Sequence, residues 1–353
     1  METLDIESLN KFWVGKRVLV TGHTGFKGSW LSLWLSNLGA DLIGVSLDPI
    51  SNPSLWNEIS NNVKISDCRN DIRGSLWKDK VREFKPEIVF HMAAQPLVVT
   101  GWEDPLLTFD TNVLGTANLL QELQMLSSVK VCLIVTSDKV YKLDETKTPR
   151  KETSELGGGD PYSASKSCVE IMVSSWPSPQ ELSIGTARSG NVIGGGDWSR
   201  DRLIPDIVNS IHKGTSFVPR SPNSIRPWQH VVEPLAGYLA MAKLMYLNPE
   251  SPKVLNFGPS LESQVSVREI LEYVSSGVDN FQLGKSLSLL QYKESQYLLL
   301  DSSLAAQHLD WIPKLDWKTS VNMTLEWYRN YYSGAEPSQL MQKDIDQYLN
   351  TVL

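Results

Sequence analysis

A tyrosine and a lysine four residues apart form the first pair with recognisable chemistry. The stretch Tyr162-Ser163-Ala164-Ser165-Lys166 opens a predicted helix over 162–176, so Tyr162 and Lys166 project from one helix face. A free phenol, with a pKa near ~10, is a poor base at neutral pH, and a neighbouring ammonium lowers that pKa. The pair could take a proton from a hydroxyl group. A Tyr and a Lys at this spacing are also common on exposed helices.

Three consecutive polar residues follow a predicted buried strand, 131–136. Ser137 lies twenty-five residues before Tyr162 and could bond the same hydroxyl, while Asp138 and Lys139 add an acid and a base. The carboxyl end of a buried strand is where open α/β sheets bind their ligands. The alternative is a solvated turn in which Asp138 and Lys139 form an ion pair.

A glycine-rich loop joins the predicted strand 17–21 to the predicted helix 28–38. Gly22, Gly25 and Gly28 have the spacing G-x-x-G-x-x-G. Such glycines allow a tight turn, close approach of a pyrophosphate and close helix packing, and the helix N-terminus attracts the anion. The loop predicts a dinucleotide cofactor, bound by residues of this loop: Gly22, Thr24, Gly25, Phe26, Lys27 and Gly28.

The sequence favours NAD over NADP. No Lys or Arg occurs between Gly44 and Asn62, where a cation would meet a ribose 2′-phosphate, whereas Asp48 is available. Lys27 is the one loop residue that argues for NADP. Asp71 and Ile72, after the third predicted strand, are expected beside the adenine.

Apolar runs alternate with amphipathic stretches along the first half of the chain. This alternation predicts an α/β fold, a Rossmann-type doubly wound parallel sheet with a smaller C-terminal α/β substrate domain. We expect residues 12–188 to bind NAD and 189–353 to bind a sugar nucleotide, with some segments crossing between the two. The predicted strands lie at 17–21, 41–45, 63–65, 88–91, 131–136, 182–188 and 254–257.

Composition narrows the class of protein. The 353 residues are 41% hydrophobic and 21% charged with a formal net charge of −7, which disfavours a nucleic-acid partner. The acidic start lacks a signal peptide's apolar core, and no apolar run reaches the ~18 residues of a membrane span. Three widely spaced cysteines, Cys68, Cys132 and Cys168, fit a reducing compartment, so we expect a cytoplasmic protein. Five scattered histidines without ligand spacing predict no metal site.

Together these motifs resemble the extended short-chain dehydrogenase/reductase family, and within it the CDP-glucose 4,6-dehydratases. The resemblance runs from about residue 12 to about residue 330. It is carried by TGHTGFKGSWL (21–31), PEIVFHMAAQPLV (86–98), TNVLGT (111–116), TSDK (136–139), GGDPYSASK (158–166), GNVIGGGDW with DRLIPD (190–206), RPWQHVVEPLAGYL (226–239), NFGP (256–259) and the LDW-x-P region (309–313).

The resemblance implies a reaction on CDP-glucose without net redox change. NAD would oxidise C4, with Tyr162 as base, Lys166 as its electrostatic partner and Ser137 assisting. Asp138 would protonate the departing C6 hydroxyl and Lys139 would act as the base at C5. Hydride would then return to C6, giving the 4-keto-6-deoxy sugar.

Further contacts and assembly come from the resemblance alone. Ala93 and Ala94 would contact the cofactor. A homodimer or homotetramer is expected. Substrate contacts would come from Gln95, Asn191, Arg202, Arg226 and His230, although His230 could equally be a structural histidine.

One segment departs from the family pattern. Where the family has Arg-x-Ser-Tyr after AAQPLV, this chain has Val99-Thr100-Gly101-Trp102, so a cation and a hydroxyl are missing. The nucleotide and the sugar therefore stay open. Another sugar-nucleotide dehydratase, an epimerase or reductase, and a cofactor-binding scaffold remain alternatives. The Asp138-Lys139 pair separates the dehydratases from epimerases and reductases, and the retained Ser137, Tyr162 and Lys166 argue against a scaffold.

Overall fold

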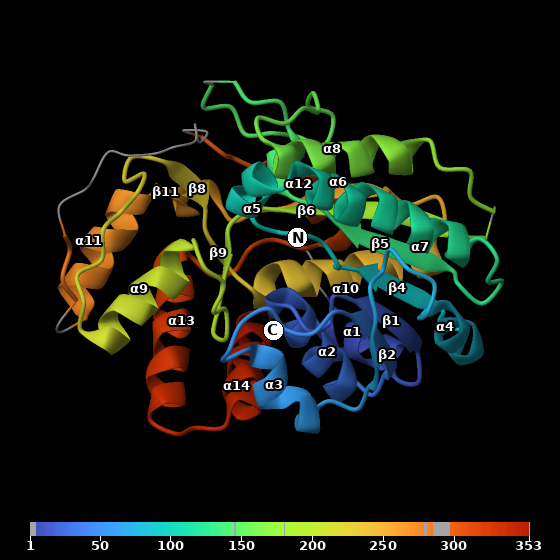
Figure 1. The fold of residues 1–353 in the computed structure, drawn as a ribbon, viewed down its shortest axis with the longest axis horizontal. Helices are drawn as coiled ribbons and strands as arrows, with labels where there is room; N and C mark the ends of the chain where they lie inside the picture. The colour runs from blue at the N-terminus through green and yellow to red at the C-terminus, as the bar shows by residue number, and fades with distance from the viewer. Residues whose placement is uncertain (1–4, 145, 180, 279–280, 285–296, 353) are drawn as a thin grey trace.

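The computed structural model describes residues 5–144, 146–179, 181–278, 281–284 and 297–352. A seven-stranded parallel sheet lies at its centre, in the order β3-β2-β1-β4-β5-β6-β10 (Figure 1). The strand order reverses between β1 and β4, the switch point of doubly wound sheets. This topology confirms the Rossmann-type fold. The strands are β1 (Arg17–Thr21), β2 (Asp41–Ser46), β3 (Ser66–Arg69), β4 (Ile88–His91), β5 (Val131–Val135), β6 (Ser183–Ser189) and β10 (Val254–Phe257).

Helices bury both faces of the sheet, which explains why its strands read as continuous apolar runs. Val18 and Val20 of β1 face one hydrophobic cluster and Leu19 faces the other. One layer contains α4 (Lys78–Phe84), α5 (Val98–Glu103), α6 (Pro105–Phe109), α7 (Gly115–Leu123) and α8 (Pro161–Ser174). The other contains α1 (Ile6–Trp13), α2 (Phe26–Asn37), α3 (Leu55–Ile59), α10 (Val232–Leu247), α12 (Ser303–Leu309) and α14 (Pro337–Val352).

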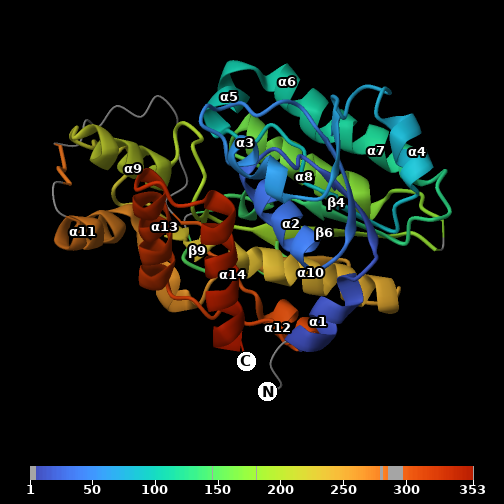
Figure 2. The same cartoon turned by 90° about the horizontal axis from the view of Figure 1, so that it is seen from below.

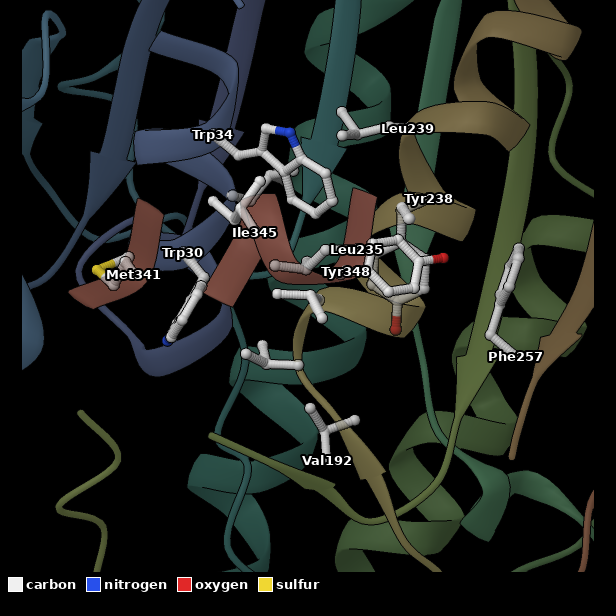
Figure 3. Close-up of a cluster of buried hydrophobic side chains, with 14 of the residues drawn as sticks. Trp30, Trp34, Val192, Leu235, Tyr238, Leu239, Phe257, Met341, Ile345 and Tyr348 are labelled. Atoms are coloured by element: carbon white, nitrogen blue, oxygen red, sulfur yellow. The ribbon is translucent and has the colours of Figure 1, made fainter. Parts of the chain in front are cut away.

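The second layer is held by large apolar side chains that converge from α2, α10 and α14. Figure 3 shows Trp30 and Trp34, Leu235 and Tyr348 in this cluster, and all four are essentially inaccessible to solvent. The C-terminal helix is therefore part of the core that supports the sheet.

A smaller lobe lies beside the sheet (Figures 1 and 2). It contains α9 (Leu203–Lys213), α11 (Val267–Gly277), α13 (Trp317–Tyr332) and two short strand pairs: β7 (Val192–Ile193) with β9 (Gln229–His230), and β8 (Ile225–Pro227) with β11 (Gln264–Ser266). It follows directly from the carboxyl end of β6. The segments that cross the expected division at residue 188 are α10, α12, α14 and β10, which belong to the layers of the main sheet.

One predicted strand differs from the structure: the third strand begins at Ser66, after the residues 63–65 expected for it. Between α6 and α7 the chain forms one turn of π-helix, η2 (Asp110–Leu114). The wide turn carries the buried Asn112 amide, which bonds Gln95 through its backbone N–H (2.8 Å) and C=O (3.1 Å). Within the described ranges, no helix combines the length and the apolar character that a membrane crossing needs.

Candidate active site

Ser137 lies just after the end of β5, and its side chain is close to Tyr162 at the start of α8. It caps a short 3-10 turn, η3 (Asp138–Val140), where its Oγ accepts from the Lys139 N–H (3.2 Å). The same hydroxyl donates to Asp138 Oδ1 (3.0 Å). The Ser137 side chain also lies close enough to the Tyr162 phenol to lower its pKa. The predicted residues Ser137, Asp138 and Tyr162 therefore lie next to one another.

Burial sets the charge states of Tyr162 and Lys166. Desolvation raises the pKa of Tyr162 to about 12, against the opposing effects of the Ser137 hydrogen bond and the Arg202 charge. Desolvation lowers the pKa of Lys166 to about 8, while Glu170 opposes that shift. The Lys166 Nζ donates to the Val135 carbonyl (3.1 Å), which fixes its position. Without a further positive charge beside it, Tyr162 is a neutral phenol at pH 7 and Lys166 is largely an ammonium.

Asp138 is a buried carboxyl with one unsatisfied oxygen. Burial raises its pKa, although Lys139, Ser137 and Arg226 pull in the other direction. Among the described residues, its Oδ2 has no hydrogen-bond partner. Gly190 packs closely beside this oxygen, because a Cβ there would lie 3.2 Å from Asp138 Oδ2 and would overlap the Pro227 ring. A carboxyl that holds its proton in this way can act as a general acid.

The glycine loop forms a cradle for an anion. Gly22 has φ +74°, and a Cβ there would lie 2.6 Å from the Ala93 nitrogen. At Gly28 a Cβ would fall on the Gly22 carbonyl oxygen. Gly25 caps α2, and in the described structure no side chain forms a capping hydrogen bond at that helix end. The first N–H groups of α2 are therefore available to a pyrophosphate, so the loop fits a dinucleotide.

Thr24 and Lys27 extend the loop in different directions. Thr24 Oγ1 lies 2.7 Å from Ser46 Oγ and donates to the Leu47 carbonyl (3.0 Å), which ties the loop to the end of β2. Lys27 Nζ donates to Ser189 Oγ (3.0 Å) at the end of β6. Burial lowers the pKa of Lys27 to about 7, with help from the charges of Arg202 and Lys166. Lys27 thus points toward the reaction site and away from the adenosine end.

The remaining predicted cofactor residues line the ends of β3 and β4. Asp71 pairs with Arg73 (2.6 Å), and Ile72 is buried against α7. The Ala93 N–H donates to Thr21 Oγ1 (3.2 Å), and Ala94 is half-buried beside it.

Arg69 is a cation that the sequence did not reveal. It pairs in register with Ser46, so the strand pairing brings it beside Asp48, with Nη1 3.4 Å from Oδ1. Its Nε and Nη2 donate to the two Asp67 oxygens (2.7 and 2.8 Å), and Asp67 also contacts His23 (2.9 Å). The residues that follow β2 in the sequence do not indicate this cation, because Arg69 belongs to the neighbouring strand β3.

Two arginines of the smaller lobe, Arg202 and Arg226, place their charges near the polar groups around Tyr162 and Asp138. Arg202 begins α9, and its charge acts on Tyr162 and Lys27. Arg226, on β8, acts on Asp138. Asn191 is half-buried directly after Gly190, and its carbonyl accepts from the Gln229 N–H (3.1 Å).

Two of the residues predicted to bind substrate, Gln95 and His230, are buried in the protein interior. The Gln95 amide is buried and bonds Thr108 Oγ1 (2.8 Å) and both backbone groups of Leu97. His230 is fully buried, with Nε2 3.5 Å from Asp344 Oδ2 of the C-terminal helix. Burial lowers the pKa of His230 to about 3, so it is a neutral interior group. The structure does not bring His230 together with the polar groups around Tyr162.

The segment that departs from the family pattern packs on the start of α8. Gly101 of α5 approaches so closely that a Cβ there would lie 3.1 Å from the Tyr162 nitrogen. Gly101 is buried and Trp102 is exposed at its side. This stretch therefore positions the N-terminus of α8. Elsewhere in the described chain, no group of three or more His, Cys, Asp or Glu side chains is placed to hold a metal.

Comparison with known proteins decides the family. The family described as "NAD dependent epimerase/dehydratase family" matches residues 18–258. The chain belongs to the NAD dependent epimerase/dehydratase family. Within this family, the CDP-glucose 4,6-dehydratase of Salmonella typhimurium is 40% identical over 352 residues, covering 96% of this chain and 98% of that protein.

Solved structures of the family share the fold. An epimerase from Methanothermobacter thermautotrophicus superposes with a TM-score of 0.81 at 22% identity, covering 96% of this chain and 97% of its own. The UDP-glucuronic acid 4-epimerase of Bacillus cereus, solved with UDP-glucuronic acid and NAD, gives 0.77 at 19% identity, covering 90% and 100%. The fold of the chain, sheet and small lobe together, is thus shared with these solved structures.

Proposed function

We propose that this chain is a CDP-glucose 4,6-dehydratase that converts CDP-D-glucose into CDP-4-keto-6-deoxy-D-glucose. The observation that carries the proposal is the Asp138-Lys139 pair beside Ser137 and Tyr162, with Asp138 buried and one of its carboxyl oxygens without a hydrogen-bond partner among the described residues. A simple dehydrogenase or epimerase needs only the Tyr162, Ser137 and Lys166 set. The glycine loop would hold NAD, and the bound cofactor would supply the hydride acceptor for oxidation at C4 and the hydride donor for reduction at C6.

Tyr162 removes the proton from the C4 hydroxyl. Its pKa of about 12 must fall for this role, and the Lys166 ammonium together with a nicotinamide cation provides the positive charge. Ser137 hydrogen-bonds the reacting oxygen. The C4 ketone that results acidifies the proton on C5.

Asp138 and Lys139 complete the elimination. The C5–H bond breaks as Lys139 takes the proton, and the C6–O bond breaks as Asp138 protonates the departing hydroxyl, so one water is lost. When the hydride is added at C6, the Lys139 ammonium returns its proton to C5. The raised pKa of Asp138 suits the donor, because it retains its proton nearer to neutral pH than an exposed carboxyl does. Arg202, Arg226 and Asn191 are assigned to the diphosphate and its surroundings, where an arginine can form charge-assisted paired hydrogen bonds.

A screen of nucleotide-activated glucoses tests this proposal. The purified protein, supplied with NAD, is incubated separately with CDP-, UDP-, dTDP- and GDP-glucose, and the products are identified by mass and NMR. We expect loss of one water from CDP-glucose, with kcat/KM at least about tenfold above the other donors. A better substrate with another base would reassign the nucleotide. No dehydration of any donor by NAD-loaded protein would overturn the proposal.

The adenosine end of the cofactor site yields a prediction about NAD and NADP. Asp48 lies twenty residues after Gly28, the position from which a carboxylate binds a ribose hydroxyl and repels a 2′-phosphate. Arg69 lies beside it. We expect Asp48→Ser to improve NADP binding about tenfold relative to NAD, because Arg69 then meets the phosphate. The measurement is the ratio of the two Kd values. The gain should vanish in Asp48→Ser/Arg69→Ala, and a gain that persists there would exclude Arg69.

Assembly and location remain predictions. Leu106, Leu114 and Ile171 are exposed by 83%, 60% and 58% on α6, η2 and α8. Such a patch supports a homodimer or homotetramer through these helices. A monomer in light scattering at micromolar concentration would contradict this assignment. The cytoplasm is the expected compartment.

A further inference from the structure

A fully buried ion pair lies behind the catalytic helix. Glu170 is four residues after Lys166 on α8, so it lies one turn further along the same helix face. Its carboxylate accepts from Arg188 Nε (3.0 Å) and Nη2 (2.8 Å), and both side chains are almost completely inaccessible. The roles assigned above do not use this pair.

Glu170 also binds the two strands that it faces. Thr136 Oγ1, at the end of β5, donates to Oε1, and Thr186 Oγ1, on β6, donates to Oε2 (2.7 Å). Its two oxygens therefore have four donors. Thr136 directly precedes Ser137, so one carboxylate joins the strand end that carries Ser137 to the helix that carries Tyr162 and Lys166.

Arg188 extends the connection to the segment that follows the site. Its Nη1 donates to the Tyr141 hydroxyl (2.9 Å), which in turn donates to Asn256 Oδ1 of β10 (2.6 Å). The same Nη1 donates to the Glu152 carbonyl (3.1 Å). Tyr141 follows η3, so this turn is held from behind by the same network.

We propose that Glu170 is a positioning residue that fixes the Ser137–Lys139 turn against the helix of Tyr162 and Lys166 and supplies the negative charge that Lys166 faces. This inference rests on the proposed function only in the roles it assigns to Tyr162 and Lys166. Besides Tyr162, the described titratable groups on which the charge of Lys166 acts include His91 of β4 and Lys27 of α2, neither of which can carry a negative charge.

The negative charge of Glu170 raises the pKa of Lys166. Glu170 opposes the lowering of the Lys166 pKa, so its removal lets Lys166 lose its proton at lower pH. The loss of a negative charge also favours the Tyr162 phenolate. For Glu170→Gln, both limbs of the kcat profile should therefore move to lower pH, by about one unit. At the optimum, kcat should fall about tenfold or more with little change in KM, because the reacting groups are misplaced.

Glu122→Gln is the matched control. Glu122 on α7 is equally buried and pairs with Arg82 through the same two nitrogens, with Nε at 2.6 Å and Nη2 at 2.9 Å, but no predicted site residue contacts it in the described structure. Both variants should lower Tm, whereas only Glu170→Gln should change kcat and the pH profile. Equal Tm losses with an unchanged profile would reduce Glu170 to a structural residue.

Two measurements keep the inference testable in all cases. If Glu170→Gln fails to fold, Thr136→Val removes the bond to β5 without leaving a charge unpaired, and it should lower kcat while KM stays the same. The titration of Lys166, followed by 15N NMR of labelled lysine and assigned with Lys166→Met, requires no turnover. A lower midpoint in Glu170→Gln supports the inference even if CDP-glucose is not the substrate, and an unchanged midpoint with unchanged kcat overturns it.

Discussion

Replacing Tyr162 by phenylalanine is expected to lower kcat about a thousandfold, because the phenol beside Ser137 that is assigned as the proton acceptor is lost. The substitution removes one oxygen from a partly buried ring, so the fold and the cofactor content should be unchanged. Turnover is measured as dehydrated product by mass, with bound NAD quantified in the same sample.

Tyr246→Phe is the control for this variant. Tyr246 lies on α10, and its hydroxyl donates to Glu87 Oε1 (3.1 Å) at the other end of the sheet. Its loss should leave kcat unchanged. If Tyr162→Phe kept wild-type turnover, the assignment of the proton acceptor would be wrong.

Asp138→Asn separates oxidation at C4 from elimination of water. Asparagine keeps the shape and can still accept from Ser137, but it cannot protonate a leaving hydroxyl. We expect product formation to fall about a hundredfold or more. The 4-keto-glucose nucleotide should accumulate. It can be trapped by reduction with borodeuteride and identified by mass spectrometry. Normal dehydration by this variant would contradict the acid role of Asp138.

The same substitution has a predicted effect on stability. Burial raises the pKa of Asp138 above its unfolded value, so ionisation of this group in the folded state opposes folding. The cost is absent well below the unfolded pKa, grows as the pH rises from the unfolded to the folded pKa, and is constant above the folded pKa. Asp138→Asn should therefore raise Tm more at pH 8 than at pH 4. A lower Tm at pH 8 would show that the charged carboxylate stabilises the fold.

Local patterns predicted which elements carry the residues of the candidate site. The glycine spacing, the strand before it and the helix after it are all determined within a dozen residues, and the structure places Gly22 and Gly28 where only glycine fits. The same holds for Ser137 and Tyr162. Each lies at the end of a strongly periodic element, and parallel strands bring their carboxyl ends to one edge.

Features that depend on tertiary packing were not predictable in this way. Arg69 reaches Asp48 because β2 and β3 pair in a particular register. His230 lies in a motif rich in polar residues, yet it is buried against Asp344 of the distant C-terminal helix. The Tyr238 hydroxyl donates to Ser189 Oγ (2.7 Å) and accepts from Lys27 Nζ. Tyr238 lies in an apolar helix, and the local sequence does not indicate these polar contacts. These contacts join segments far apart in the sequence, and composition and spacing carry no record of them.

The central claim is that hydride leaves C4 and returns to C6 of the same sugar. The most direct test supplies CDP-glucose deuterated at C4 to the purified protein with unlabelled NAD, and locates the deuterium in the product by NMR and mass. Recovery of the deuterium at C6 of a 4-keto-6-deoxy product is the predicted result. Deuterium retained at C4, or a product that keeps its C6 hydroxyl, would contradict the account.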